Sequence, residues 1–352
     1  MNPLTQSNLF FSSLFEDPEV TAVFETGRTF ARFLAFEIAL SEALAASGAV
    51  DVSTAKAAIK KMHSFSPDMN AIKVASPIDG VPVPEFLRQL RKHVGADLTP
   101  AVHVGSTSQD LIDTATVLAL KEVNDTFTAR LETAIAGIER LIESQGNNSL
   151  MGRTRMQAAL PITVRHRLEN WVIPLYRHRD SLAGMRSDLQ VLQFGGATGD
   201  RSANRDKVVE IGADLANRLG LTDPGYAWHN DRTRFVAYAG WLSLVTGSLG
   251  KIGQDICLMA QQGIEEITQS GGGTSSAMAH KQNPVKAEML IALAQYNAGQ
   301  LALMHNALIH EQERSGSAWT LEWMVLPAMV CTTGRALQIA VSQLDEISRV
   351  GS

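Results

Sequence analysis

The sequence predicts an all-α protein in which long helices form an elongated antiparallel bundle. Three intervals without proline support this prediction, because proline in a helix interior removes a hydrogen bond and clashes with the preceding turn. They lie between Pro100 and Pro161, between Pro224 and Pro284, and between Pro284 and Pro327. In each interval apolar residues recur at steps of three or four, the pattern of one buried helix face. Alternating β-branched runs bounded by turn residues are scarce, so few strands are expected.

The N-terminal part predicts a smaller helical domain over residues 1–103. Residues 20–62 have the spacing of a helix. Residues 65–84 contain four prolines and are expected to form a loop-rich break, followed by a helical segment over residues 85–92. The side of the first helical region expected to face the core carries Phe30, Phe33, Leu34, Phe36, Ile38, Ala39 and Leu44.

The central bundle is expected over residues 104–345, with a short tail over residues 346–352. Each long helix should bury one apolar stripe. The three stripes are Ala119, Val123, Phe127, Leu131, Ile135, Ile138 and Ile142; then Leu242, Val245, Leu249, Ile252, Ile256 and Met259; then Met289, Leu293, Tyr296, Leu301, Met304 and Leu308.

The composition narrows the class of protein. The chain has 352 residues, enough for a large core, and a formal net charge of −5. Nucleic-acid-binding proteins normally carry a basic face, which this charge does not favour. Two cysteines, Cys257 and Cys331, are too few for a disulfide scaffold, and no apolar run is expected to reach the length of a membrane span. Residues 1–6 lack the basic and apolar parts of a signal peptide, so a cytoplasmic protein is expected.

The first polar interruption of the helical pattern is His103–Asp110, directly before the first long helix. One interpretation is a helix start in which Thr107 is the N-cap and Asp110, three residues later, completes a capping box. The other is an anion site, because free N–H groups and hydroxyls at a helix N-terminus bind carboxylates. Taken alone, the segment favours capping.

The second interruption is Gly152–Gln157, which carries Arg153 and Arg155. Two arginines separated by one residue usually belong to a solvated surface. On a loop that faces a cleft they would instead bind carboxylates through their forked guanidinium groups. The residues alone slightly favour the surface.

The third interruption, Ser270–Pro284, combines three glycines with serines, a histidine, a lysine and an asparagine. A flexible linker is one interpretation, because glycines free the backbone and Pro284 suits the start of a helix. The spacing of a phosphate-binding loop is absent, and no His/Cys cluster has the spacing of metal ligands. A linker has no need of Lys281 and Asn283 in these positions, so a functional loop is favoured.

The third interruption resembles the signature loop of the fumarase/aspartase superfamily, usually Gly-Ser-Ser-x-Met-Pro-x-Lys-x-Asn-Pro. Gly105–Asp110 and Gly152–Gln157 are similar to the first and second signature regions and stand in the same order. The resemblance covers about residues 20–335. Two further stretches, residues 228–234 and 310–323, are similar to the 3-carboxy-cis,cis-muconate cycloisomerase branch of this superfamily.

The resemblance implies a cofactor-free enzyme of protocatechuate breakdown, in the β-ketoadipate pathway, with no metal site. It would convert 3-carboxy-cis,cis-muconate, a small-molecule tricarboxylate, to 4-carboxymuconolactone. Members of the family are homotetramers whose active sites combine the three signature regions from different subunits. Neither a nucleic acid nor a membrane is expected as a partner. Relatives usually continue past the bundle into a small C-terminal domain, so that domain is expected to be absent here.

The same resemblance assigns roles to single residues. Ser275 would donate the proton, while Lys281 and Asn283 would stabilise an aci-carboxylate intermediate. Thr107 and Ser108 would hold a substrate carboxylate. The wider set of expected substrate-binding residues is His103, Ser106, Thr107, Ser108, Arg153, Arg155, Gln157, Ser276, Met278, Arg232 and Arg314.

Two positions depart from the family pattern. The second signature region usually reads Gly-Arg-Thr-His, and its histidine assists a leaving amine or hydroxyl; here that position is Arg155. A carboxylate needs no proton to act as nucleophile or leaving group, so the change suits a cycloisomerase, and Arg155 could bind the extra carboxylate. Ala279 replaces the usual proline and is expected to change loop stiffness more than chemistry.

Three alternatives stay open at this point. The chain could be a superfamily lyase acting on a succinyl compound, although the missing histidine speaks against it. It could be a cycloisomerase that prefers a 3-sulfomuconate, which has a similar charge. It could also be a catalytically silent helical scaffold, which the joint presence of Ser275, Lys281 and Asn283 makes less favourable.

Overall fold

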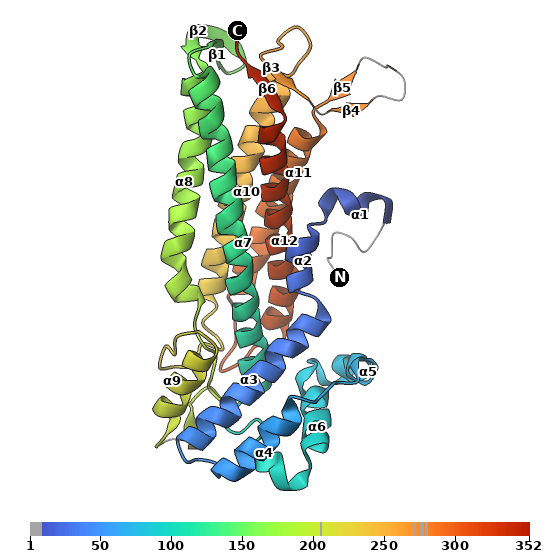
Figure 1. The fold of residues 1–352 in the computed structure, drawn as a ribbon, viewed down its shortest axis with the longest axis vertical. Helices are drawn as coiled ribbons and strands as arrows, with labels where there is room; N and C mark the ends of the chain where they lie inside the picture. The colour runs from blue at the N-terminus through green and yellow to red at the C-terminus, as the bar shows by residue number, and fades with distance from the viewer. Residues whose placement is uncertain (1–8, 205, 271, 275–277, 279–280) are drawn as a thin grey trace.

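Five long helices form an elongated bundle in the computed structural model, which describes residues 9–204, 206–270, 272–274, 278 and 281–352 (Figure 1). Successive long helices run in opposite directions along the long axis of the molecule. The all-α fold and the elongated antiparallel bundle that the sequence predicted are confirmed. The bundle helices are α7 (Ser108–Gln145), α8 (Val164–Leu189), α10 (Thr233–Met259), α11 (Val285–Asn306) and α12 (Ser317–Asp345).

Shorter helices gather mainly around the lower end of the bundle as drawn in Figure 1, which we call the lower end. The helix expected over residues 20–62 is three helices, because the chain leaves helical geometry after Val23 and again after Ala46. The N-terminal elements are α1 (Leu9–Phe15), α2 (Pro18–Val23), α3 (Thr26–Ala46), α4 (Val52–Met62), α5 (Met69–Asp79), α6 (Val83–Val94) and the 3-10 helix η1 (Ala96–Ala101). Two elements join α8 to α10, the 3-10 helix η2 (Ser202–Asn204) and α9 (Val208–Arg218).

The loop-rich break expected over residues 65–84 is wrong, because α5 occupies much of it. Asp68 caps this helix by accepting from the backbone N–H groups of Asn70 and Ala71, and Gly80 ends it in the left-handed region at φ 74°. Pro77 stands inside this helix, in its last turn, where it has no N–H to donate to the Lys73 carbonyl.

The apolar stripes expected on α7 and α10 are buried at every position. On α11 only Leu293 and Met304 of the expected stripe are fully buried. Helices α10 and α11 pack closely on small residues, which leaves less room for large apolar side chains between them. A Cβ added to Gly253 of α10 would come within 2.5 Å of the Ala287 carbonyl oxygen of α11. The buried face of α11 therefore consists of Ala287, Leu290, Leu293, Asn297 and Met304.

Among the residues that the structure describes, three two-stranded antiparallel sheets lie at the opposite end of the bundle, which we call the upper end (Figure 1). The residues expected as a short tail include the strand β6 (Ile347–Val350), so that expectation is corrected for these residues. The sequence did not predict β1 (Ser149–Thr154) and β2 (Gln157–Thr163), because their tight turn uses Arg155 and Met156 at φ 49° and 67°, without the glycine or asparagine that marks such turns. The pairs are β1 (Ser149–Thr154) with β2 (Gln157–Thr163), β3 (Ile267–Gln269) with β6 (Ile347–Val350), and β4 (Gly273–Thr274) with β5 (Gln282–Asn283).

Among the described helices, α12 is long and apolar enough to cross a membrane by length and composition alone. The expectation that no segment reaches this length is therefore wrong. However, 72% of the apolar window is buried inside the protein. The apolar character of α12 is accounted for by its position in the core of the bundle, which it shares with α10 and α11.

Candidate active site

The start of α7 at the lower end is organised by Asp110. Its carboxylate accepts from Thr107 N at 2.9 Å, which completes the capping box, and from Gly195 N and Gly196 N at 3.0 Å each. His229 Nε2 lies 2.8 Å from the same carboxylate. The side chain of Asp110 is fully buried. The capping interpretation of this segment is confirmed, and the cap also ties the loop after α8 to the first signature region.

Four of the residues expected to bind substrate lie at this helix start: Ser106, Thr107, Ser108 and Arg314. Ser106 Oγ donates to Asp110 at 3.3 Å, and Ser108 is the first residue of α7. Arg314, from the connection between α11 and α12, donates from Nε to Gln109 Oε1 at 2.9 Å. Segments about 200 positions apart in the sequence therefore meet here, as their resemblance to one enzyme family implied.

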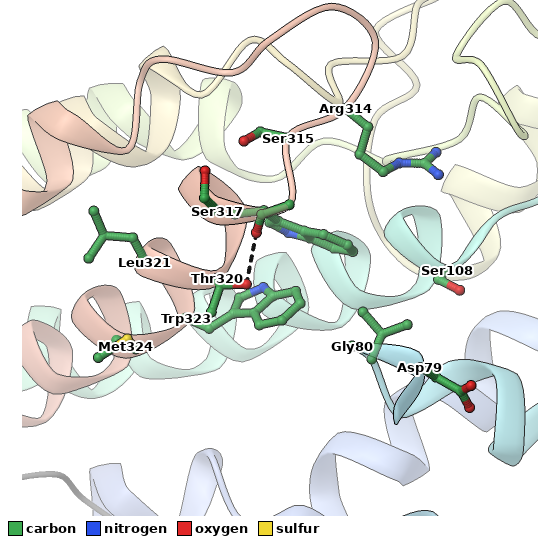
Figure 2. A pocket seen from close by; sticks show the side chains of 13 residues that line it. Asp79, Gly80, Ser108, Arg314, Ser315, Ser317, Thr320, Leu321, Trp323 and Met324 are labelled. Carbon is green, nitrogen blue, oxygen red and sulfur yellow. Dashed lines mark hydrogen bonds between the residues drawn. The ribbon is translucent and has the colours of Figure 1, made fainter. Parts of the chain in front are cut away.

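A pocket of about 850 Å³ opens beside these residues (Figure 2). In the view of Figure 2, Arg314 and Ser108 lie on one side of it, Leu321 and Met324 on the other, and the Trp323 ring between them. Polar groups that can bind an anion thus face an apolar wall that can pack on a carbon chain. The lining consists of Asp79, Gly80, Val81, Ser108, Arg314, Ser315, Gly316, Ser317, Trp319, Thr320, Leu321, Trp323 and Met324.

His103 also lies at the lower end, and its partner was not expected. Its Nδ1 is 2.6 Å from Oε1 of Glu37, a fully buried residue of α3. Glu37 stands in the apolar helical pattern between Phe33 and Leu40. A charged residue on a buried helix face was the signal that could have identified it.

Arg232 corrects the expectation that it binds substrate. Its guanidinium is buried between Asp113, at 2.6 Å, and Glu322, at 2.5 Å, and the Trp228 ring lies 4.9 Å away. Burial opposes the charge, but the attraction of the two carboxylates outweighs it and raises the pKa of Arg232. These two carboxylates occupy the hydrogen-bonding groups of the Arg232 guanidinium. Arg232 joins the start of α10 to α7 and α12, and it is not among the residues that line the pocket.

The buried carboxylate Glu322 shows the opposite balance. Burial raises its pKa, and the charge of Arg232 offsets this only in part. Trp319, at the edge of the pocket, donates from its indole nitrogen to Asp113 at 3.1 Å. Asp113, Glu322 and Trp319 are structural residues that reasoning from the sequence missed, since nothing in their spacing marks them as partners of Arg232.

The second signature region forms the β1–β2 hairpin at the upper end. Arg153 is paired with Glu266 at 2.5 Å, whereas Arg155 is exposed at the turn and has no hydrogen bond or ion pair to any described residue. Gln157 begins β2 opposite Thr154 and is exposed. A cleft of about 830 Å³ lies beside the hairpin. Its lining includes Arg153, Arg155, Arg167 and Lys251, together with the carboxylates Glu266 and Asp255, which pair with Arg153 and Lys251. The anion-binding interpretation of the hairpin therefore has a cleft to support it.

The third signature region forms the β4–β5 hairpin, also at the upper end (Figure 1). Asn283 is half-buried opposite Gly273, and Lys281 is exposed, with its backbone N–H donating to the Met278 carbonyl at 3.1 Å. Met278 itself is 45% exposed. Ser275 and Ser276 lie outside the described residues, so their roles stay predictions.

The two ends of the bundle are far apart. At a rise of about 1.5 Å per residue, the 38 residues of α7 span about 57 Å. The first signature region stands at one end of this helix and the second region follows its other end. The described residues of one chain therefore form two separate clusters, one at each end. Among these described residues, no group of three or more His, Cys, Asp or Glu side chains is placed to hold a metal ion.

Comparison with known proteins decides the family. The family model described as "Lyase" matches residues 12–297. The chain belongs to this lyase family. It is 34% identical to the 3-carboxy-cis,cis-muconate cycloisomerase of Pseudomonas aeruginosa, over 96% of this chain and 75% of that protein.

Two solved structures of family relatives have the same fold. The 3-carboxy-cis,cis-muconate lactonizing enzyme of Pseudomonas putida aligns with a TM-score of 0.90 and 34% identity, over 97% of this chain and 77% of that one. A fumarate lyase from Mesorhizobium sp. BNC1 aligns with a TM-score of 0.89 and 28% identity, over 96% and 76%. The superfamily resemblance drawn from the three signature regions is confirmed.

Proposed function

We propose that this lyase-family chain is a cycloisomerase that converts 3-carboxy-cis,cis-muconate to 4-carboxymuconolactone. The observation that carries the proposal is the 34% identity, over 96% of the chain, to a relative with that activity in its name. The clusters at the two ends of the bundle supply the polar residues that such a substrate requires. The pathway implied by this activity is protocatechuate breakdown, and the proposed location is the cytoplasm.

The reaction is an intramolecular addition. One substrate carboxylate oxygen forms a C–O bond to an alkene carbon, and the alkene electrons move toward the neighbouring carboxylate to give an aci-carboxylate. Lys281 and Asn283 stabilise the charge of this intermediate, and Ser275 transfers its hydroxyl proton to the adjacent carbon. Because a trianion becomes a dianion, each turnover takes up one proton, which returns to Ser275 from solvent.

The anionic substrate is held by groups from both ends of the bundle. Ser108 and Arg314 are available at the pocket of the lower end, together with the helix N-terminus at Thr107. Arg155 is the unpaired guanidinium of the cleft at the upper end. We assign it to the third carboxylate, the one that distinguishes this substrate from unsubstituted muconate.

We further propose that the active sites lie between the subunits of a homotetramer. The support is the length of α7, which keeps the two clusters of one chain about 57 Å apart. The β4–β5 hairpin projects away from the bundle, as Figure 1 shows, so it is placed to reach another chain. A symmetric assembly can bring unlike ends of different chains together.

The test is a comparison of 3-carboxymuconate, unsubstituted muconate and 3-sulfomuconate as substrates. We expect loss of conjugated-diene absorbance with 3-carboxymuconate, accompanied by uptake of one proton per turnover in a pH-stat. Ser275→Ala should abolish turnover and leave the assembly intact. Well-folded protein that leaves the 3-carboxymuconate absorbance unchanged would contradict the proposal, and faster turnover of the sulfonate would reassign the substrate.

The assignment of Arg155 has its own test within this comparison. Arg155→His should raise the KM for 3-carboxymuconate by on the order of ten-fold or more, since a charged hydrogen-bonding partner is lost. Its effect on unsubstituted muconate should be small. Equal effects on the KM of the two substrates would show that Arg155 does not bind the third carboxylate.

A lyase acting on a succinyl compound is the second candidate, and the similarity to the Mesorhizobium fumarate lyase favours it. Such an enzyme would release an amine or hydroxyl, a step that the usual histidine assists and for which this chain has Arg155. Formation of fumarate from a succinyl substrate, followed by its ultraviolet absorbance, would identify this activity.

A further inference from the structure

Two tryptophans of α12, Trp319 and Trp323, stand in the lining of the pocket at the lower end. They are four residues apart and therefore lie on one face of the helix. Their ring centroids are 4.5 Å apart and the ring planes meet at 62°, an edge-to-face arrangement that aromatic pairs favour. Each ring thus limits the orientations that are open to the other.

Trp319 is anchored in the protein interior. It is 4% exposed, and its indole Nε1 donates to Asp113 at 3.1 Å. Asp113 is held in turn by two N–H groups of Arg232, at 2.6 and 3.1 Å, and by the amide of Gln193 at 3.0 Å. Glu322, on the same turn of α12, pairs with the same arginine. The first turns of α12 are therefore fixed to buried charged groups at two positions.

Trp323 is only partly buried and reaches the pocket. Figure 2 shows its ring between the polar side of the pocket, with Ser108 and Arg314, and the apolar side, with Leu321 and Met324. Its Nε1 atom is buried and has no hydrogen-bond partner among the residues that the structure describes. What Trp323 presents to a ligand in the pocket is therefore the surface of its ring.

The two sides of the pocket suit different parts of one ligand. An aromatic face carries partial negative charge, so it repels carboxylates and packs well on a flat, unsaturated carbon chain. The guanidinium of Arg314 and the hydroxyl of Ser108 are suited to carboxylates. A saturated chain is puckered and flexible, so it would contact the ring less evenly and lose more conformational freedom on binding.

We propose that Trp323 is the specificity-determining residue of the lower pocket and that it selects anions with a planar, conjugated carbon chain. The chain lies against its ring, while the carboxylates lie toward Ser108 and Arg314. Trp319 is a positioning residue, which holds the Trp323 ring and is itself held by Asp113. The identity of the ligand as 3-carboxymuconate rests on the proposed function, whereas the preference for a conjugated chain does not.

The preference is tested without turnover, by calorimetric titration with trans,trans-muconate and adipate. Both are dicarboxylates with the same number of carbons, and only the first is conjugated. Its trans double bonds keep each carboxylate away from the alkene carbon that lactonisation requires, so it is not expected to cyclise. The selectivity ratio is the Kd of adipate divided by the Kd of trans,trans-muconate.

We expect a selectivity ratio above one in the unaltered protein. In Trp323→Leu it should fall about five-fold, because trans,trans-muconate loses a stacking surface that adipate uses less well. Unaltered protein that binds trans,trans-muconate no more tightly than adipate would overturn the proposal, and so would an unchanged ratio in the folded variant.

Two further variants separate the ring from its N–H group and from apolar area in general. Trp323→Phe keeps a ring and should keep most of the selectivity ratio, whereas a loss as large as in Trp323→Leu would overturn the proposal. Met324→Ala is the matched control, since Met324 lines the same pocket and is 64% exposed but has no aromatic face. It should weaken the binding of both ligands equally, and a fall in the ratio equal to that of Trp323→Leu would show that apolar area alone accounts for the preference.

The role of Trp319 is tested by a double-mutant cycle. Trp319→Phe breaks the bond to Asp113, which retains Arg232 and Gln193 as partners. Alone, this change should lower the selectivity ratio about two-fold, and in the Trp323→Leu background it should add nothing. Independent, multiplying effects would show that Trp319 does not act through Trp323.

The link to the proposed reaction is tested with 3-carboxymuconate and its saturated counterpart, butane-1,2,4-tricarboxylate. Trp323→Leu should raise the KM of the first about five-fold and leave the inhibition constant of the second within about two-fold. Equal changes in the two constants would contradict the assignment of the conjugated chain to Trp323. If the unaltered protein does not turn over 3-carboxymuconate, the proposed function fails, and the calorimetric titrations still decide the role of Trp323.

Discussion

At the scale of single residues, burial separates the arginines that hold the fold from those free to hold a ligand. Arg232 is only 1% exposed and has two carboxylate partners, while Arg155 is exposed and has no ion pair to a described residue. Arg155 stands in a segment similar to the second signature region of the superfamily, and Arg232 in a stretch similar to its cycloisomerase branch. The charge of a residue in such a motif therefore does not tell whether it stabilises the fold or binds a ligand until its burial is known.

Removal of the Arg232 charge should unfold the protein more readily. Arg232→Met leaves Asp113 and Glu322 buried together without a counter-charge, so we expect a loss of about 3–5 kcal/mol in the free energy of unfolding. Urea denaturation measures it. The control is Arg28→Met, which breaks the exposed pair with Glu122 and should cost less than about 1 kcal/mol. A normal stability together with a raised KM would instead restore Arg232 as a substrate ligand.

At the scale of elements, the closeness of β4 to the start of α11 controls the third signature loop. A Cβ on Gly273 would come within 2.5 Å of Val285 Cγ2, so a larger residue there must displace the hairpin or the valine. Because Asn283 pairs with Gly273, that shift would move a proposed catalytic group. Glycine is needed at this position because of close packing. Its backbone conformation does not require glycine, since its φ is not in the left-handed region.

Gly273→Ala should accordingly lower kcat by about 100-fold, the effect of a small misplacement of a catalytic group, with little change in the unfolding midpoint. Adding Val285→Ala should recover much of the activity, because it removes the clashing methyl group. Gly184→Ala on α8 is the control, since a Cβ there meets nothing within 4 Å. If the double variant is as slow as Gly273→Ala, the contact with Val285 is not the cause.

The elements also show how far the sequence could predict the fold. The apolar stripes on α7 and α10 could be predicted from the sequence because large apolar residues occupy every buried turn of these helices. The buried face of α11 was not, because alanine and a polar residue, Asn297, form part of it. The amide nitrogen of Asn297 donates to Thr333 Oγ1 inside the core at 3.0 Å, a partner that no local pattern reveals.

The parts of the candidate site that are formed by residues close together in the sequence could be predicted. Thr107 and Asp110 form the expected capping box because a cap needs only its own helix. Glu37 was missed because its partner His103 is 66 positions away. Signature motifs identify which segments matter, whereas the partners that orient them come from the tertiary fold.

At the scale of the whole molecule, the proposed tetramer makes a prediction about mixtures of subunits. Ser275→Ala removes the proposed proton donor of the third signature region, and Arg314→Gln removes a proposed substrate ligand at the lower end, so each variant alone should have little activity. In an equal mixture, about a quarter of the sites should combine two intact ends from different chains, and activity should recover to that extent. Co-expression with two different tags, followed by purification on both, provides the mixed assemblies.

The control is a mixture of Ser275→Ala with Lys281→Ala. Both changes fall in the third signature region, so recovery should be far smaller if one chain must supply both groups to a site. Mixed assemblies of the first pair that stay inactive would show that each site is built within one chain.

The length of α7 also determines how the enzyme would respond to dilution. In the proposed tetramer each site combines clusters from different chains, so a separated subunit would have no complete site, however well folded it is. Activity per subunit would then decline as the protein is diluted below the dissociation constant of the assembly, while the helix content stays nearly constant. Because α7 keeps the two clusters of one chain apart, the activity of the proposed tetramer would depend on protein concentration as well as on substrate concentration.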